Sequence, residues 1–294
     1  MEIRSPRTSR ELAQCVELQA EVLRGTFEDS EVSPTFQFAW RNHKLLGCIF
    51  WQETADGGAL IVPPVVWAAS PQEVTRAGRM LLTEAIADCH RQRRQFALLF
   101  IDATDSFGLR IASADATIVP IADILVLEYP LDRRKPRKPA DANHGNAIPY
   151  EARIRDRFLK TFIASHQESR DCLALKALRT PSQAFATFEQ GQESPSALSL
   201  LWQAADEDAG VLFLRQNTIE CCLEISFLGV IPKLRRQGIA RTMLNAALQL
   251  SQIRHLSKIQ VMVDATNIPA RALYESAHFV ETGRSTLFLI EQSN

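Results

Sequence analysis

Two related hexapeptides, IDATDS and VDATNI, occur once in each half of the chain, and their aspartates, Asp102 and Asp264, are 162 positions apart. An amphipathic stretch and an apolar run precede each copy, and a further apolar run follows each. A weaker likeness places a Trp-Gln pair after a strand-like run at Trp51 and again at Trp202. Self-similarity of this kind indicates a duplicated supersecondary unit. We therefore expect two halves that share one α/β architecture.

A proline-rich, basic stretch over residues 129–150 separates the two halves. Such a composition is typical of a linker between domains, and 294 residues exceed the about 100–200 of one domain. We predict a first domain over 1–132, a basic linker over 133–147 and a second domain over 148–294. The basic run at 133–138 could also contact nucleic acid, but a solvated, self-repelling linker is the favoured interpretation.

Charge and composition exclude several classes of partner. The formal net charge is -1, so no chain-wide electrostatic attraction to nucleic acid or anionic membranes is expected. No stretch approaches the about 20 apolar residues that cross a bilayer, and we expect a cytoplasmic protein without a membrane partner. The 6 cysteines and 6 histidines show no spacing of a metal site or disulfide framework, and we expect neither.

The most informative segment is a strand, a basic turn and an amphipathic helix over residues 222–253. The strand alternates apolar and mixed positions, and Pro232 ends it because proline cannot donate to a strand ladder. Gly238 then opens the helix without a Cβ. A helix N-terminus offers unpaired N–H groups and a partial positive charge. This arrangement predicts a phosphate-binding turn.

A second segment, VMVDATNIPARALYESAHF, reads as a strand followed by a short helix. Asn267 is a suitable N-cap residue for that helix. Tyr274 follows seven residues later, which places both side chains on one helical face.

Together, these segments resemble the GNAT superfamily of N-acyltransferases, whose cofactor motif runs V-x-P-x-x-[QR]-x-x-G-x-[GA], followed by a strand and N-x-x-A-x-x-x-Y. The chain supplies Val230, Pro232, Arg235, Gly238, Ala240, Asn267, Ala270 and Tyr274. His278 stands where the family more often has glycine. The resemblance covers about residues 148–294. With the repeat, it implies two GNAT-like domains, each with a mixed, mostly antiparallel central sheet flanked by helices.

The resemblance further implies an acyl-CoA co-substrate, acetyl-CoA above all, an amine acceptor that is a small molecule or a protein, and no metal. The residues expected to contact CoA are Leu228, Val230, Arg235, Arg236, Gln237, Gly238, Ile239, Ala240, Arg241, Asn267 and Ala270. Backbone groups at Leu228 and Val230 would pair with the pantetheine arm, which Asn267 would also touch. The N–H groups from Arg236 to Arg241 would hold the pyrophosphate.

Two residues are candidates for proton transfer. Tyr274 matches the family's usual general acid, and Glu224 lies where some relatives carry a base. A structural role stays open for each. Tyr274 could be a half-buried residue that packs the helix against the sheet, and Glu224 could be a solvated carboxylate on its strand. An acyl-cysteine at Cys221 or Cys222 is disfavoured because nothing in the sequence pairs either with a histidine base. The rival to an enzyme is a non-catalytic acyl-CoA sensor or interaction module.

The first half departs from the motif. With the offset of the repeat, the residues opposite Gly238, Asn267 and Tyr274 are Arg76, Asp105 and Ala112. We therefore expect a degenerate copy without a cofactor site. In the family, the helices before the sheet shape the acceptor site, and here they correspond to about 150–190. Arg170, Asp171 and Cys172 are candidates on that side.

Overall fold

The computed structural model describes residues 1–15, 34–68, 70–131, 145–189, 198–204, 206–218 and 220–291. The chain divides into two compact units. Unit 1 comprises Met1–Ala122 with Ser285–Asn294, and unit 2 comprises Asp123–Arg284. Most of the predicted linker, at 133–144, lies outside the described residues, and so does its basic run. The last linker positions, 146 and 147, belong to a strand instead.

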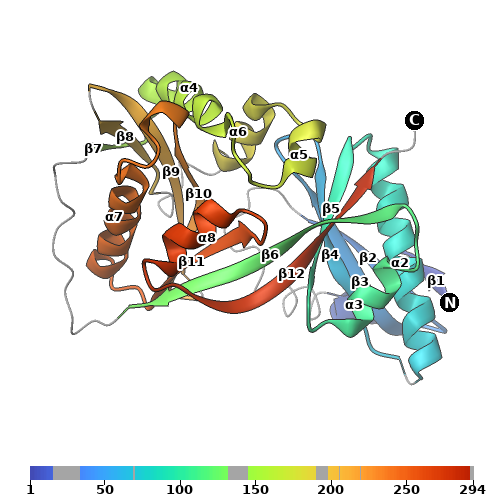
Figure 1. Cartoon of the computed structure of the whole chain (residues 1–294). Coiled ribbons are helices and arrows are strands. Elements are labelled where there is room, and N and C mark those ends of the chain that lie inside the picture. The colour runs from blue at the N-terminus through green and yellow to red at the C-terminus, as the bar shows by residue number, and fades with distance from the viewer. Residues whose placement is uncertain are drawn as a thin grey trace. The chain divides into compact units, whose positions relative to one another are not determined.

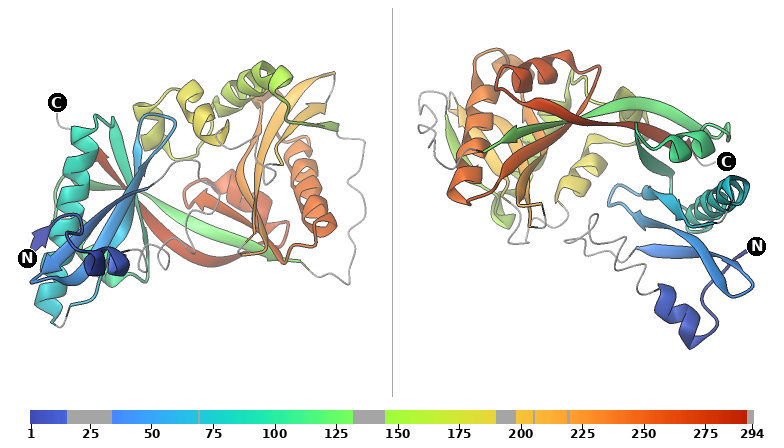
Figure 2. Two further views of the ribbon diagram at one scale, coloured as in Figure 1. Left: turned by 180° about the vertical axis from the view of Figure 1, so that it is seen from behind. Right: turned by 90° about the horizontal axis from the view of Figure 1, so that it is seen from below.

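Unit 1 contains a six-stranded sheet with one parallel pair. Its order is β1-β2-β3-β4-β5-β12, with only β4 and β5 parallel. The strands are β1 (Glu2–Ile3), β2 (Thr35–Arg41), β3 (Lys44–Glu53), β4 (Ala59–Val66), β5 (Phe96–Asp102) and the second part of β12 (Val280–Glu291). The unit also contains α2 (Pro71–Arg91), α3 (Ser106–Ala112) and the start of β6 (Ile118–Pro130). Figure 2 shows α2, in cyan, along these strands.

The core of unit 1 follows from the helical period of α2. Its buried positions include Ala77, Leu81 and Ala85, spaced four apart, so one face of the helix meets the sheet. That face packs on inward-facing strand residues such as Ile61 and Leu99.

Unit 2 is built on the same plan. Its sheet order is β6-β11-β10-β9-β8-β7, again with one parallel pair, β10 and β11. The strands are β7 (Asn146–Pro149), β8 (Leu200–Ala204), β9 (Glu207–Asn217), β10 (Cys222–Val230), β11 (Lys258–Asp264) and the second part of β6. The helices are η2 (Ala152–Ile154), α4 (Arg155–His166), α5 (Leu173–Leu178), α6 (Pro181–Glu189), η3 (Pro232–Leu234), α7 (Ile239–Ile253) and α8 (Ile268–Glu275). The predicted fold class, a mixed and mostly antiparallel sheet flanked by helices in each half, is confirmed.

Helices cover both faces of the unit 2 sheet. On β9, Leu212 and Leu214 join the core formed with α7, whereas Val211 and Phe213 join the aromatic core formed with α4 and α6. This is the alternation that a strand buried on both faces requires.

The two units exchange their final strands. β6, from the first half of the sequence, pairs antiparallel with β11 of unit 2 over Ile124–Pro130. β12, the last strand, pairs antiparallel with β5 of unit 1 over Ser285–Glu291. β6 is green and β12 red in Figure 1. The compact units therefore differ from the expected boundaries at 132 and 148, because ladder hydrogen bonds tie 124–130 to the second half and 285–291 to the first.

The structure supports the duplication at the DAT motifs. The carboxylate of Asp102 accepts from the backbone N–H of Thr104 at 2.7 Å, and that of Asp264 accepts from Thr266 at 2.7 Å. Asp105 caps α3 through the N–H of Gly108 at 2.8 Å, and Asn267 caps α8 through Ala270 at 3.3 Å. The two copies make the same turn and the same cap.

Two other predicted equivalences are wrong. Trp51 lies in β3, the third strand of its sheet, whereas Trp202 lies in β8, which holds the second position. Arg76 lies within α2, whereas Gly238 precedes α7 as its N-cap. The residue that occupies the N-cap position of α2 is Ser70. The constant offset fails at the helix starts because α2 has 21 residues and α7 has 15, although the helix ends, Arg91 and Ile253, keep the offset.

No helix of the described residues is long and apolar enough to cross a membrane. All 6 cysteines are unpaired, and only Cys221 is exposed.

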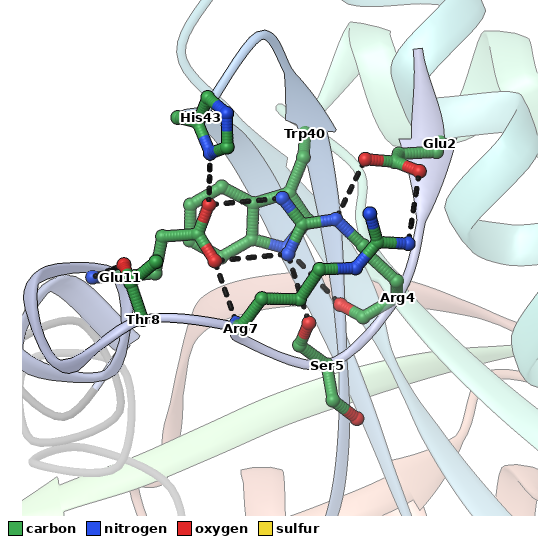
Figure 3. Close-up of polar contacts among 8 residues, drawn as sticks. All are labelled: Glu2, Arg4, Ser5, Arg7, Thr8, Glu11, Trp40 and His43. Atoms are coloured by element: carbon green, nitrogen blue, oxygen red, sulfur yellow. Dashed lines mark hydrogen bonds and ion pairs between the residues drawn. The ribbon is translucent and has the colours of Figure 1, made fainter.

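A buried carboxylate fastens the N-terminus to unit 1 (Figure 3). The Arg4 guanidinium donates to both oxygens of Glu11, at 2.9 and 3.0 Å, and the backbone N–H of Arg7 donates at 2.6 Å. Arg4 also lies over the Trp40 ring, 4.8 Å from its centroid, and its carbonyl accepts from Trp40 Nε1 at 3.0 Å. The hydrogen bonds from Arg4, followed by that from Arg7, hold the pKa of Glu11 well below its usual range.

We predict that Glu11→Gln lowers the urea midpoint of unfolding at pH 7. A carboxyl whose pKa is lowered by folding stabilises the protein above its unfolded pKa of 4.5, and this contribution is lost as pH falls further towards the folded value. The difference in midpoint between wild type and variant should therefore shrink below about pH 4.5. Glu2→Gln, at the exposed partner of the same arginine, is the control and should change the midpoint much less. Equal destabilisation by Glu11→Gln at pH 3 and pH 7 would contradict the prediction.

Candidate functional site

The site begins where two parallel strands stop pairing. β10 and β11 are in register only over Cys222–Ile225 and Lys258–Val261, although both strands continue, to Val230 and Asp264. On its other side, β10 stays paired with β9, with a register shift between Ile225 and Phe227 that leaves Ser226 as the bulged residue. Bulges of this kind bend a strand and end its pairing. One edge of β10 is therefore unpaired over its second half.

The unpaired edge presents the backbone of Leu228 and Val230. The N–H of Ile231 donates to the carbonyl of Ala209, at the start of the β9 ladder, at 2.9 Å. Successive residues of a strand direct their backbone groups to opposite edges. Val230 and Leu228 therefore direct theirs away from β9. The Val230 carbonyl accepts from Arg235 Nε at 2.9 Å.

The turn after β10 exposes the start of α7. Arg236 and Gly238 both have left-handed backbone conformations, with φ of 64° and 83°. Gly238 is the N-cap, a position where left-handed φ favours glycine. Thr242 is the first helix residue whose N–H reaches a carbonyl of the cap, that of Gly238 at 3.1 Å. Within the described chain, no side chain caps the preceding N–H groups.

The arginine side chains of this turn have different partners. Arg235 donates to the carbonyls of Ser165 and Gln167 at the end of α4, at 3.0 and 2.7 Å, in addition to Val230. Arg241 donates to the carbonyl of Ser276 after α8, at 3.0 Å. Arg236 is exposed. Arg235 and Arg241 thus hold neighbouring segments around the turn, and Arg236 is the guanidinium most open to a ligand.

Asn267 and Tyr274 lie on α8, one at its start and one near its end. Asn267 is the N-cap of α8, as predicted, and its side-chain oxygen accepts a hydrogen bond from the backbone N–H of Ala270. Its side chain is half-buried. Tyr274 is only 4% exposed and packs on Phe279, with ring centroids 5.4 Å apart. Its hydroxyl makes no hydrogen bond to any described residue. His278 takes φ of 67°, the conformation for which glycine is the usual choice.

Burial, and then the negative charge of Asp171, raise the pKa of Tyr274. The phenol therefore stays protonated at neutral pH. Although part of Asp171 is open to solvent, the surrounding protein raises its pKa, and the charge of Asp264 raises it further. These interactions place Asp171, an acceptor-side candidate, in the electrostatic environment of Tyr274.

Glu224 lies on β10 where the strand is still paired with β11. Its carboxylate is half-buried and accepts from Asn217 Nδ2 at 3.2 Å. By strand alternation, it faces away from Leu223 and Ile225, which join the core that buries Tyr274. Glu224 and Tyr274 therefore belong to opposite faces of the sheet.

Sequence reasoning missed a histidine at this place. His166, the last residue of α4, stacks on Phe227 of β10, with ring centroids 5.0 Å apart and planes 9° apart. Burial lowers its pKa to about 4, so the ring is neutral at pH 7 and a weak base. Nothing in the sequence pairs His166 with Phe227, because the contact depends on how α4 packs on the sheet. The described residues contain no group of three side chains suited to hold a metal ion.

Comparisons with known proteins agree with this geometry. Residues 162–279 match the profile of the Acetyltransferase (GNAT) family. The whole chain superposes on a GCN5-related N-acetyltransferase from Sphaerobacter thermophilus, with a TM-score of 0.67, 17% identity and 96% of that chain covered. It also superposes on a tandem GNAT protein from the clavulanic acid biosynthesis pathway, with a TM-score of 0.66, 14% identity and all of both chains covered.

Over residues 162–279 the chain is thus similar to the GNAT family, and its fold as a whole is that of the solved GNAT structures. Its matched part contains the β10–α7 turn and α8, the two elements that carry the motif. Among curated proteins, a mycothiol acetyltransferase from Beutenbergia cavernae is 31% identical over 136 residues, 41% of this chain and 44% of that protein. One from Acidothermus cellulolyticus is 40% identical over 65 residues, 22% of this chain and 20% of that protein. The chain thus matches less than half the length of these relatives.

We predict that Arg235→Lys destabilises unit 2 more than it weakens CoA binding. Lysine keeps the charge but cannot span three carbonyl acceptors, so the free energy of unfolding should fall by about 1–3 kcal/mol. Denaturant titration and CoA titration measure the two effects. Arg236→Lys, at an exposed side chain, is the control and should leave stability within about 0.5 kcal/mol. A stable Arg235→Lys variant with lost CoA affinity would instead assign the side chain to the phosphates.

Proposed function

We propose that this protein transfers an acyl group, acetyl in the first instance, from acyl-CoA to a primary amine by direct attack in a ternary complex. The observation that carries the proposal is the turn from Arg236 to Arg241 at the end of a strand edge without a partner. Uncapped N–H groups at a helix start bind phosphate oxygens well. The free edge of β10 offers an extended amide-containing arm the hydrogen bonds that a neighbouring strand would make.

The residues expected to hold CoA follow from that geometry. Backbone N–H groups of Arg236, Gln237, Gly238, Ile239, Ala240 and Arg241 would hold the pyrophosphate. Leu228 and the N–H of Val230 would pair with the pantetheine arm, since the Val230 carbonyl already accepts from Arg235. The half-buried Asn267 and Ala270 would bound the arm on the side of α8. The side chain of Arg235 would stabilise the turn through its hydrogen bonds to the carbonyls of Val230, Ser165 and Gln167.

The reaction requires a neutral amine, stabilisation of the developing oxyanion and a proton for the departing thiolate. The amine nitrogen forms a bond to the acyl carbon, and the carbon–sulfur bond breaks. In our proposal, Tyr274 donates its hydroxyl proton to the sulfur. Burial raises the pKa of this phenol and keeps it protonated, and the same apolar surroundings disfavour an unprotonated thiolate, so the two effects of burial on the proton transfer oppose one another.

Glu224 is the proposed acceptor of the proton that the amine loses. It comes from the opposite face of the sheet to Tyr274, so the two groups would act on different sides of the acyl carbon. Its hydrogen bond from Asn217 orients the carboxylate and leaves further lone pairs for a water molecule.

The experiment that tests the function mixes the protein with acetyl-CoA and a panel of amines and records thiol release. The panel contains polyamines, amino acids, aminoglycosides and peptides with free N-termini. Release that requires both substrates supports the enzyme. Tight binding of acetyl-CoA with no thiol from any acceptor would favour the rival function, a non-catalytic acyl-CoA sensor.

Tyr274→Phe is the matched variant. Because it removes only the hydroxyl, kcat should fall by about 10²-fold while CoA affinity stays the same. Tyr150→Phe, at a hydroxyl bonded to Glu189, is the control and should turn over like wild type. Unchanged turnover by Tyr274→Phe would reduce Tyr274 to a packing residue.

For Glu224→Gln, we predict a changed pH–rate profile. If the carboxylate takes the amine proton, its loss removes the inflection that carboxylate ionisation gives to kcat against pH, and only the rise that follows the fraction of free amine remains. Cys222 lies on the same strand face but does not take part, so Cys222→Ala should keep the wild-type profile. If the Glu224→Gln variant has the same pH–rate profile as wild type, Glu224 is not the base.

A further inference from the structure

A hollow of about 600 Å³ lies on unit 1, whereas the motif that carries the proposed function belongs to unit 2. Its lining comes from the first half of α2 and from α3, and includes Gln72, Arg76, Arg79, Met80 and Arg110. Arg76, Arg79 and Arg110 are all exposed. Three guanidinium groups thus border one concavity on a chain whose formal net charge is -1.

Close packing of α2 and α3 brings the three arginines together. Arg76 and Arg79 are one helical turn apart on α2 and flank its buried Ala77 and Gly78. A Cβ on Gly78 would lie 2.4 Å from Phe107 Cζ, so only glycine admits this ring against α2. Arg110 follows Phe107 by one turn on α3, and its guanidinium carbon lies 5.9 Å from the ring centroid. Phe107 is therefore the anchor that places Arg110 beside the α2 arginines.

Their charge is not neutralised by the described part of the protein. Other arginines of unit 1 have carboxylate partners: Arg4 pairs with Glu11, Arg91 with Glu84 and Arg94 with Glu53. The carboxylate nearest to Arg76 in sequence, Glu73, is in an ion pair with Arg41 at 2.5 Å. No ion pair of Arg76, Arg79 or Arg110 occurs among the described residues. Like charges held together in this way repel one another until an anion binds.

We propose that this hollow binds a small organic phosphate with at least two phosphoryl groups, of the nucleoside diphosphate class. Arginine forks match the oxygens of a phosphate in pairs, and three of them suit more than one phosphoryl group. The volume lies within the about 300–1,000 Å³ of small-ligand sites. Met80 supplies an apolar surface for the organic part, and the Gln72 amide supplies donors and an acceptor for its polar atoms.

The test is calorimetric titration of ADP into the full chain at low salt. Arg79→Gln combined with Arg110→Gln should weaken one ADP-binding event at least about tenfold, because each loses charge-assisted bonds to phosphate. Arg10→Gln combined with Arg93→Gln removes the same charge from exposed positions of the same unit and should keep wild-type affinity. Raising the salt concentration should weaken the event in wild type and control alike.

Three outcomes of the ADP titrations would overturn the proposal. These are no ADP binding by the wild type, equal ADP affinity in wild type and the Arg79/Arg110 variant, or equal loss in the control variant. Thermal melts of both variants establish that each is folded. AMP serves as the second probe, and binding as tight as that of ADP would show that a single phosphate suffices, against the proposed class. Because ADP bound at the β10–α7 turn would be unaffected by either variant, the result is independent of the acyltransferase proposal.

Discussion

The end of pairing between β10 and β11 is the constraint on which the unit 2 site depends. Had the parallel ladder continued past Ile225 and Val261, the backbone of Leu228 and Val230 would be satisfied by β11, with no edge left for a ligand. The bulge at Ser226 bends β10 while β9 keeps it in the sheet. Arg235 then secures the turn by donating to carbonyls from β10 and the end of α4. The exposed start of α7 and the open strand edge therefore come from one local irregularity and its support.

Local features of this site were predictable from the sequence, because they are set by residues close together in the chain. Asn267 caps α8 through Ala270, three residues on, and Gly238 takes the left-handed φ that its residue type allows. The role of Arg235 was not predictable, since its acceptors at Ser165 and Gln167 are about seventy positions away and are carbonyls, which any sequence provides. The stacking of His166 on Phe227 is hidden for the same reason.

The exchanged strands show where sequence reasoning about domains stops. The runs that become β6 and β12 are apolar and strand-forming, and would fit beside either β5 or β11. Nothing in such a run specifies its neighbour, because backbone ladders are the same for every residue type. A boundary drawn at the proline-rich stretch therefore follows the order of the chain, whereas the compact units follow the antiparallel pairs at Ile124–Pro130 and Ser285–Glu291.

α2 and α7 each connect the two parallel strands of their unit. Comparison of these two helices indicates that the two copies kept the same fold and diverged in the residues suited to bind an anion. The parallel pair of unit 1 also ends early, at Ile61 and Leu99. At the start of α2, however, Ser70 Oγ accepts the N–H of Glu73, Pro71 has no N–H, and Glu73 adds a negative charge. Each change opposes a phosphate at the helix start. The positive charge of this unit lies instead on the flank of α2, where the contact between Gly78 and Phe107 gathers Arg76, Arg79 and Arg110. In our proposals, the two copies of the fold thus bind anions at different places on equivalent helices, at the start of α7 and about two turns into α2.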